Sequence, residues 1–367
     1  MVSPRPELKN IKDFLHGGID YKELVNFNLK PEEIIDFSSS LNPLGTPYKV
    51  LESLVKVKID AYPDTNCYEL KEAIAKFHGL KQENIIVGNG STEIIYFACQ
   101  CYLTKKSRVI IPSPTFSEYE RASVINGAKV VLYRLKESND FRIDPKELLK
   151  LLIEHKPKMV FLCNPNNPTG HYLGENDVRE IIEASEKTLI VLDEAYVDFV
   201  KAPWDSTKFV RYKNLLILKS LTKSFGLAGL RIGYALADEE IIKTLEKVRP
   251  PWNVNSVAQK AALVSLFERK HIEKAKEEIE LARNYLTQEI SKMGRKPIPS
   301  HGCFFMVKVD DARKLRLALL EQGILVRDCT SFGLPNFIRI SVRRLSECKR
   351  LIKAWREVEK KIWVEKP

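Results

Sequence analysis

The feature that most constrains the fold is a regular alternation of short apolar runs and amphipathic segments over residues 84–218. The apolar runs have the length of strands and occupy residues 85–87, 108–111, 130–132, 159–163, 189–192 and 215–218. Segments with helical periodicity lie between most of them, at residues 93–102, 117–125, 145–153 and 175–184. Strands that alternate with helices build a mostly parallel sheet with helices on both faces. The sequence therefore predicts an α/β fold, with ligands bound at the carboxyl ends of the strands.

Polar loops follow these strands where ligand chemistry is expected. The loop at residues 88–92, Gly-Asn-Gly-Ser-Thr, opens a helix, and free N–H groups at a helix N-terminus can bind an anion, although many such loops are only turns. Phe116 follows the second run and either offers its face to a flat ring or packs in the core. Asn167 lies in a turn-rich loop after residues 159–163 and can offer neutral donors to a ring substituent.

An acidic residue follows the strand at residues 189–192. Asp193 begins the run Asp-Glu-Ala-Tyr, which places a carboxylate at the end of a buried strand. A buried carboxylate without a partner takes up a proton, whereas a cationic ring N–H opposite it keeps it ionised. Asp193 is therefore a candidate partner for a protonated heterocycle, and a helix cap is the structural alternative.

The stretch at residues 220–234, SLTKSFGLAGLRIGY, combines a lysine with hydroxyls, glycines and an arginine at the end of the last predicted strand. A lysine forms a Schiff base with an aldehyde most readily when it is partly desolvated or close to another cation. Arg231, eight residues after Lys223, can be that cation. The alternative is a surface loop in which both side chains are solvated.

The spacing from Ser220 to Lys223, with Arg231 eight residues later, resembles the cofactor-binding segment of fold-type I pyridoxal phosphate enzymes, the class I and II aminotransferase superfamily. The resemblance extends over about residues 16–343. It implies the type I fold of pyridoxal-phosphate-dependent transferases, which has a large domain with a mostly parallel sheet between helices and a small α+β domain. It also implies pyridoxal 5'-phosphate as the cofactor and gives no reason to expect a metal.

The resemblance gives each loop a role, and Lys223, Asp193 and Tyr196 are the expected catalytic residues. Tyr62 corresponds to a tyrosine that reaches the cofactor phosphate of the neighbouring subunit, which implies a homodimer with shared active sites. The residues expected to hold the cofactor within one subunit are Ser91, Thr92, Ser220 and Arg231 on the phosphate, Phe116 on the ring face, Asn167 and Tyr196 on the phenolic oxygen, Asp193 on the ring nitrogen and Lys223 as the Schiff-base lysine.

The domain organisation follows from a change in composition. The paired prolines at residues 250–251 end a helix and mark a boundary, and long charged helical segments follow. We expect residues 1–46 to form an N-terminal arm that packs with the small domain. Residues 47–250 are expected to form the large cofactor-binding domain, and residues 251–367 the small C-terminal domain. A single helical region is predicted over residues 256–293, followed by strands at 304–309, 325–327 and 337–342.

Two arginines of the predicted small domain are candidate substrate ligands. Arg339 alternates with apolar neighbours in a strand, so its side chain faces the side opposite to theirs. By the resemblance, Arg339 clamps a substrate α-carboxylate, a bidentate contact that lysine cannot reproduce. Arg327 matches an arginine that binds a substrate phosphate, or else it makes an ordinary surface ion pair. The expected partner is thus a small phosphorylated amino acid or amine.

The reaction expected from the N-terminal segments is decarboxylation. His-Gly-Gly at residues 16–18, DFSSSLNPLG at 36–45 and PPWNVN at 250–255 are similar to L-threonine O-3-phosphate decarboxylase of cobalamin biosynthesis, whose product is (R)-1-aminopropan-2-yl phosphate. His16 and Asn42 would then join Arg327 at the substrate phosphate. The alternative is histidinol-phosphate aminotransferase, of histidine biosynthesis, or another aminotransferase of the superfamily. A non-catalytic regulator that binds the cofactor would need an effector or DNA-binding module, and no segment is long enough to form one.

Composition excludes other classes of protein. The formal charge of +11 comes from Lys and Arg interleaved with Glu, as in KAKEEIELAR at residues 274–283, a pattern typical of a solvated helix face rather than a nucleic-acid platform. No apolar run reaches 18 residues, so we expect no membrane span, and the first ten residues lack the apolar region of a signal peptide. Seven scattered cysteines without a CxxC pair favour the reducing cytoplasm.

Overall fold

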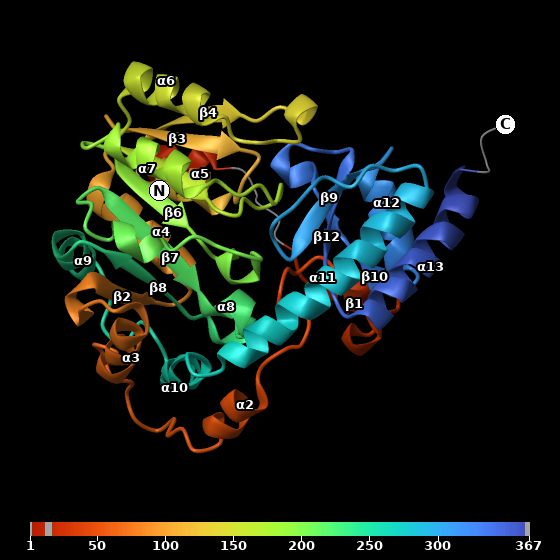
Figure 1. The fold of residues 1–367 in the computed structure, drawn as a ribbon, viewed down its shortest axis with the longest axis horizontal. Helices are drawn as coiled ribbons and strands as arrows, with labels where there is room; N and C mark the ends of the chain where they lie inside the picture. The colour runs from red at the N-terminus through yellow and green to blue at the C-terminus, as the bar shows by residue number, and fades with distance from the viewer. Residues whose placement is uncertain (1, 12–16, 364–367) are drawn as a thin grey trace.

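The computed structural model describes residues 2–11 and 17–363 and confirms the α/β architecture. Figure 1 shows a larger lobe built around a central sheet and a smaller lobe that contains the C-terminal strands and helices. The long helix α11 (Arg269–Lys292) runs between the two lobes. No helix in the described ranges is long and apolar enough to cross a membrane.

Seven of the described strands form the central sheet, in the order β2-β8-β7-β6-β5-β3-β4. Neighbours from β7 to β4 are parallel, whereas β8 runs antiparallel to both β2 and β7, so the sheet is mostly parallel, as predicted. The bounds along the chain are β2 (Ile85–Gly88), β3 (Arg108–Ser113), β4 (Lys129–Arg134), β5 (Met159–Cys163), β6 (Leu189–Asp193), β7 (Leu215–Ser220) and β8 (Gly233–Ala237). The prediction missed β8, which begins at Gly233, within the last two residues of the stretch at 220–234 that was read as a ligand-binding loop.

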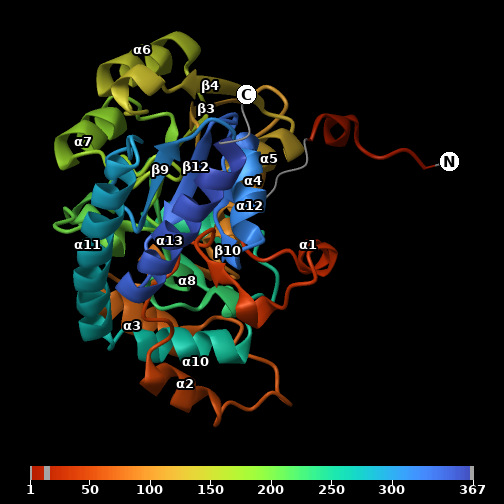
Figure 2. The same cartoon turned by 90° about the vertical axis from the view of Figure 1, so that its right-hand side faces the viewer.

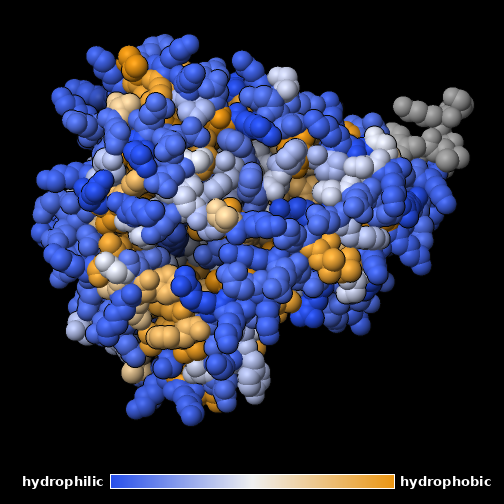
Figure 3. Space-filling view, in the orientation of Figure 1, coloured by the Kyte–Doolittle hydropathy of each residue, from blue (hydrophilic) through white to orange (hydrophobic). Residues whose placement is uncertain are grey.

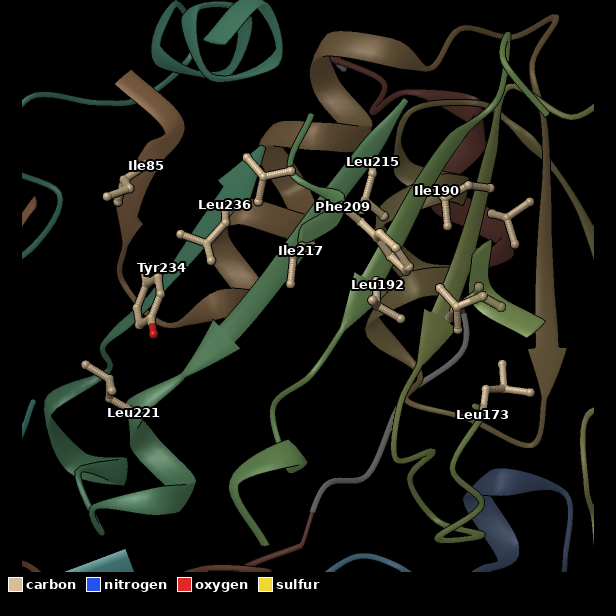
Figure 4. Packing of buried hydrophobic residues seen from close by; sticks show 14 of the residues in the cluster. Ile85, Leu173, Ile190, Leu192, Phe209, Leu215, Ile217, Leu221, Tyr234 and Leu236 are labelled. Atoms are coloured by element: carbon tan, nitrogen blue, oxygen red, sulfur yellow. The ribbon is translucent and has the colours of Figure 1, made fainter. Parts of the chain in front are cut away.

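Helices cover both faces of this sheet because successive residues of each strand point to opposite sides. Ile85 and Val87 pack in one core, whereas Ile86 packs in the other. Figure 4 shows the first core, in which Ile217 and Leu236 of neighbouring strands lie on the same face. This core is covered by α3 (Tyr68–His78), α6 (Pro145–His155), α7 (Glu175–Glu183) and α10 (Ser256–Ser265), and the second by α4 (Ser91–Tyr102), α5 (Glu118–Ile125) and α9 (Glu239–Glu246).

Local sequence signals fix where these helices begin. The Asp144 carboxylate accepts hydrogen bonds from Lys146 N and Glu147 N, and Pro145 occupies the first helical position of α6. Asp238 caps α9 and Asn255 caps α10 in the same manner. Each cap satisfies backbone donors that a helix leaves without an internal partner, so short polar residues fix where these helices begin.

The small lobe contains a three-stranded antiparallel sheet, ordered β11-β12-β9, with helices packed on it. The N-terminal segment joins this lobe because β1 (Ile35–Asp36) pairs in parallel with β10 (Ile324–Leu325). Figure 2 shows α1 (Tyr21–Asn26) beside the same lobe. The remaining bounds are β9 (Phe304–Lys308), β11 (Arg327–Asp328), β12 (Phe337–Ser341), α2 (Tyr48–Leu54), α8 (Leu221–Ser224), α12 (Ala312–Leu320) and α13 (Leu345–Trp363).

The helical region predicted at residues 256–293 is two helices, α10 and α11, which belong to different cores. Ala258, Ala261 and Ala262 of α10 pack with the strands of the central sheet, whereas Ala282 and Leu286 of α11 pack with the small lobe. The chain thus crosses from the larger to the smaller lobe near Arg269. The domain limits at residues 46 and 250 remain predictions from the sequence.

Candidate active site

A cavity of about 510 Å³ opens between the lobes at the carboxyl ends of the parallel strands. This is the edge where the sequence predicted ligand binding. Most of the predicted site residues line it: Ser91, Thr92, Phe116, Asn167, Asp193, Tyr196, Ser220, Lys223, Arg231, Arg327 and Arg339.

An anion cradle forms one end of the cavity, where α4 begins. Gly90 has φ +77°, and a Cβ there would lie 2.7 Å from Arg231 Nη2. A Cβ on Gly233 would lie 2.5 Å from Ser91 N. Both glycines are therefore required for the arginine and the helix N-terminus to approach each other, and the helix presents free N–H groups and hydroxyls to this space.

Hydroxyls from the lysine segment face the same cradle. Ser220 Oγ lies 2.6 Å from Thr222 Oγ1, and both residues line the cavity. Arg231 is exposed rather than buried, and its Nη1 donates to Ala228 O over 3.2 Å. Several neutral donors and one cation thus converge on a space suited to a phosphate.

Asp193 ends β6 and is 4% exposed. Its Oδ2 accepts a hydrogen bond from Tyr119 OH over 2.7 Å, and its Oδ1 accepts one from Ala195 N over 3.0 Å. Burial raises the pKa of Asp193 above its ordinary value, while the bond from Tyr119 opposes that rise. The carboxylate is held in place and can accept a further donor from the cavity.

Tyr119 is a site residue that the sequence analysis missed. It lies on α5, is fully buried and stacks on Phe161 with ring centroids 4.6 Å apart. The edge of its ring meets Phe116, which is three residues earlier, at 5.5 Å. The sequence offered only a tyrosine three residues after Phe116 as a signal, because its partner Asp193 lies 74 residues away.

Lys223 lies on α8, directly after β7, with its ammonium 5.9 Å from the centre of the Tyr196 ring. Burial lowers the pKa of Lys223 to about 8, and the charges of Arg339 and Arg231 add to the effect. The proximity of Arg231 was expected from the sequence, whereas the role of Arg339 was not. A lysine with this pKa is partly neutral near physiological pH and can act as a nucleophile or a base.

Asn167 and Tyr196 lie on the small-lobe side of the cavity. Asn167 is 8% exposed, and its Oδ1 accepts a hydrogen bond from Arg339. Tyr196 is 6% exposed, and its ring meets Phe304 edge-on at 4.9 Å. Burial raises the pKa of the Tyr196 hydroxyl well above its usual value, so the group is a neutral donor.

Arg327 and Arg339 face each other across the pairing of β11 and β12. Arg339 Nη2 donates to Ser38 O over 2.6 Å, and Arg327 Nη2 donates to Ser331 Oγ over 2.6 Å. Burial and the charge of Arg339 lower the pKa of Arg327 to about 10. Like charges directly opposite each other in a sheet are unfavourable, so an anion in the cavity would stabilise this pair.

Three predicted residues stand apart from this group. Asn42 Nδ2 donates to Ser224 O over 2.7 Å and its Oδ1 accepts from Leu44 N over 2.9 Å; the described lining of the cavity includes Leu41 but not Asn42. Tyr62 is 80% exposed and stacks on Trp252 at 4.5 Å. His16 lies outside the described residues.

The arrangement can hold a flat, phosphorylated, cationic heterocycle and a second anion. Asp193 offers a carboxylate, the start of α4 offers donors suited to a phosphate, and Lys223 lines the same cavity. Arg327 and Arg339 add two cationic side chains to the lining of this cavity.

Solved structures with the same fold are found among enzymes of related chemistry. A histidinol-phosphate aminotransferase from Sinorhizobium meliloti, in complex with pyridoxal-5'-phosphate, matches with a TM-score of 0.86 over 97% of both chains, at 22% identity. The L-threonine-O-3-phosphate decarboxylase from Porphyromonas gingivalis matches with a TM-score of 0.78 over 88% of this chain and 98% of its own, at 26% identity.

Curated relatives are more similar in sequence. The histidinol-phosphate aminotransferase of Moorella thermoacetica is 36% identical over 362 residues, which is 96% of this chain and 92% of that protein. The enzyme of the same name from Akkermansia muciniphila is 35% identical over 334 residues, or 90% of this chain and 91% of that protein.

These relatives contradict the expected decarboxylation of L-threonine O-3-phosphate, and that prediction is wrong. It depended on three short segments near residues 16, 42 and 252, whereas identity to the aminotransferases extends over almost the whole chain. One of its residues, Asn42, uses its amide to bind backbone atoms. A structural turn and a ligand contact leave the same Asn-Pro pattern in a sequence, so the pattern could not distinguish them.

The sequence model of the family described as aminotransferase class I and II matches residues 32–354, which include both lobes and the whole cavity. The resemblance inferred from the lysine segment is thereby confirmed. The donor set fits the family's cofactor, because a buried carboxylate, a half-buried lysine and an anion cradle line one cavity. The chain therefore belongs to the class I and II aminotransferase family, whose cofactor is pyridoxal 5'-phosphate.

Proposed function

We propose that this protein is a histidinol-phosphate aminotransferase. It transfers the amino group of L-histidinol phosphate to a 2-oxo acid such as 2-oxoglutarate, so that the amine carbon of the first becomes a ketone and the second becomes an amino acid. The observation that carries the proposal is the Arg327–Arg339 pair in one cavity with Lys223 and Asp193, since it suits an anionic substrate. The whole-length identity to enzymes of this name supports the choice of substrate.

Each part of the cofactor is proposed to have its own protein ligands. Asp193 is proposed to pair with the ring nitrogen, and Phe116 to cover one face of the ring. When bound, the cofactor supplies an electron sink for the electron pair released at the substrate's α carbon. The proposed phosphate ligands are Ser91, Thr92, Ser220 and Arg231, and the proposed partners of the phenolic oxygen are Asn167 and Tyr196.

Lys223 is proposed to carry the cofactor and then to move a proton. Its Nζ, once displaced by the substrate amine, accepts the proton from the substrate α carbon. A pKa of about 8 leaves part of the amine neutral at physiological pH, as a general base requires. The positive charges of Arg231 and Arg339 contribute to this tuning.

Arg327 and Arg339 are proposed to receive the charged groups of both substrates in turn. Histidinol phosphate has a phosphate and no carboxylate, whereas 2-oxoglutarate has two carboxylates. Two guanidinium groups at a fixed separation can bind either set through charge-assisted hydrogen bonds. Arg339 Nε is buried and has no hydrogen-bond partner among the described residues, so the donors of this guanidinium are not all satisfied within the protein.

We also propose a homodimer in which Tyr62 reaches the cavity of the second subunit. Tyr62 and its neighbours expose an apolar surface that a monomer would leave in water. Figure 3 shows a patch of apolar side chains at the lower left, in the region of α3 and α10, on a mostly hydrophilic face that has smaller apolar groups elsewhere. The large exposed side chains of residues 48–77 and 252–267 are Tyr48, Leu51, Val55, Ile59, Tyr62, Tyr68, Phe77, Trp252 and Phe267.

The seven cysteines are all free thiols in the structure, and most are buried. This supports the cytoplasmic location expected from the sequence, because thiols persist in a reducing compartment.

The test is a two-substrate assay. Purified protein with bound cofactor is given histidinol phosphate and 2-oxoglutarate, and glutamate is measured. We expect glutamate in step with loss of histidinol phosphate, and a much lower kcat/KM with unphosphorylated histidinol. The Lys223→Ala variant is the control for uncatalysed transfer. Absence of glutamate, or equal kcat/KM for the two amines, would contradict the proposal.

A further inference from the structure

A buried pair of opposite charges, Lys219 and Glu194, lies beside the cofactor cavity. Lys219 Nζ is 2.6 Å from Glu194 Oε2, and the two side chains are 15% and 0% exposed. Ser206, at the start of η6 (Ser206–Phe209), donates its hydroxyl to the same carboxylate oxygen over 2.6 Å. A buried ion pair of this kind contributes little net stability to a fold, so stabilisation alone does not explain why it lies here.

Each member of the pair is next to a residue of the site. Glu194 follows Asp193 directly, and Lys219 precedes Ser220 at the end of β7. Strands β6 and β7 are parallel neighbours, and Glu194 N donates to Leu218 O over 3.0 Å. The ion pair therefore fastens together the two strand ends that carry Asp193 and Lys223.

Lys219 lies on the face of the central sheet opposite to the one proposed for the cofactor. Side chains alternate along β7, so Lys219 points away from the side to which Leu218 and Ser220 point. Lys219 lines a second cavity of about 150 Å³, together with His78, Asp198 and Tyr234, and Ser220 lines both cavities. On the same side, Ser224 Oγ donates to Asp198, which ties the residue after Lys223 to η5 (Val197–Phe199).

The charges around Lys219 come from several elements. Burial disfavours its positive charge, but Glu194 and then Asp198 outweigh burial and hold the pKa of Lys219 above its usual value. Asp205, which caps η6, acts in the same direction. His78 of α3 is neutral, because burial and the charge of Lys219 lower its pKa to about 4.

We propose that the Lys219–Glu194 ion pair is a positioning element of the cofactor site, which holds the ends of β6 and β7 so that Asp193 and Lys223 keep their spacing. The inference rests on the proposed roles of these two residues toward the cofactor and is independent of which amine is the substrate. Glu194 also bears on Asp193 directly, because its negative charge adds to the effect of burial in raising the pKa of Asp193.

The test measures cofactor binding without any substrate. The variants are Lys219→Met, Glu194→Gln and the double variant, and the readouts are the Kd for pyridoxal 5'-phosphate and the pH midpoint of the visible absorbance of the bound cofactor. Each single variant is expected to weaken binding by about tenfold or more, the scale for losing a residue that orients a ligand-binding side chain. Loss of the Lys219 cation favours protonation of nearby groups. Lys219→Met is therefore expected to shift the midpoint of the cofactor's absorbance to higher pH. Glu194→Gln shifts it to lower pH, and the double variant returns it toward the wild-type value.

The matched control is Lys71→Met, which breaks a remote ion pair of the same 2.6 Å length and 15% lysine exposure, to Glu246. We expect Lys71→Met to leave the Kd and the midpoint unchanged. The conservative variant Lys219→Arg keeps the cation and is expected to retain both values. Lys219→Met that behaves like Lys71→Met, with thermal stability reduced but Kd and midpoint unchanged, would overturn the proposal. If Lys219→Met does not fold, Glu194→Gln decides by the same readouts. Inactivity of the wild-type protein toward histidinol phosphate would refute the proposed function and leave this test valid.

Discussion

Replacing Tyr119 by phenylalanine tests how the site controls Asp193. The change removes one hydroxyl, which donates to Asp193 Oδ2 over 2.7 Å. The ring keeps its stack on Phe161, at 4.6 Å, and its edge contact with Phe116, so the core packing is retained. The main direct consequence is that a buried carboxylate loses one of its two intramolecular donors within the described chain; the hydroxyl's contact with the Cys163 thiol is lost as well.

The magnitude follows from the strength of that bond. A hydrogen bond to a charged group is worth about 1.5–3 kcal/mol, and one pKa unit corresponds to about 1.36 kcal/mol. Burial already raises the pKa of Asp193, and Tyr119 opposes the rise, so its loss should raise that pKa by about 1–2 units more. Asp193 is then protonated over a wider pH range and no longer pairs with a cationic ring nitrogen, so turnover falls.

The assay is the pH dependence of kcat/KM from about pH 6 to about pH 9.5. We expect the acidic limb of Tyr119→Phe to move to higher pH by about 1–2 units, with activity recovering as pH rises. Tyr96→Phe is the matched control, because Tyr96 OH donates to another carboxylate of the cavity lining, Glu118, over the same 2.7 Å. An unmoved limb in Tyr119→Phe, or an equal shift in both variants, would refute the reasoning.

Three further predictions concern the substrate, the packing and the lysine. Arg327→Gln should lower kcat/KM for histidinol phosphate by about 10- to 150-fold, from the loss of about 1.5–3 kcal/mol, and barely change it for histidinol; equal losses would exclude a phosphate contact. Gly170→Ala should unfold at a much lower temperature than Gly294→Ala, because both glycines have φ +74° but only the Gly170 Cβ would clash, 2.0 Å from Ser300 Oγ. Equal unfolding temperatures would contradict this packing. In the cofactor-free protein, labelling of Lys223 by an amine reagent should rise through about pH 8, because the neutral amine reacts; a midpoint near that of exposed lysines would contradict the lowered pKa.

The fold was predictable because its signals are local. Buried strands such as Met159–Cys163 are apolar throughout, and helix starts such as Asp144-Pro145 have short polar caps. The cofactor segment was predictable because Lys223 and Arg231 lie in one loop at a fixed spacing. The sequence is sufficient to predict a strand, a helix start or a loop residue when its position depends on a few neighbouring residues.

Features that depend on distant contacts were not predictable. Strand β8, GYALA, is short and contains glycine and alanine, which have weak strand preference, and it forms because it lies between β2 and β7. The break between α10 and α11 contains neither glycine nor proline. Tyr119 was missed because its partner, Asp193, is 74 residues away. Nothing in the sequence indicated that the Asn42 amide binds Ser224, 182 residues later in the chain.

The central claim is tested most directly by following the nitrogen atom. Histidinol phosphate labelled with ¹⁵N at its amine is incubated with 2-oxoglutarate and the cofactor-loaded protein, and the products are analysed by mass spectrometry. Our account predicts that the label appears in glutamate, one atom for each molecule of histidinol phosphate converted, and that Lys223→Ala abolishes the transfer. Label that remains in histidinol phosphate or is released as ammonia would contradict it.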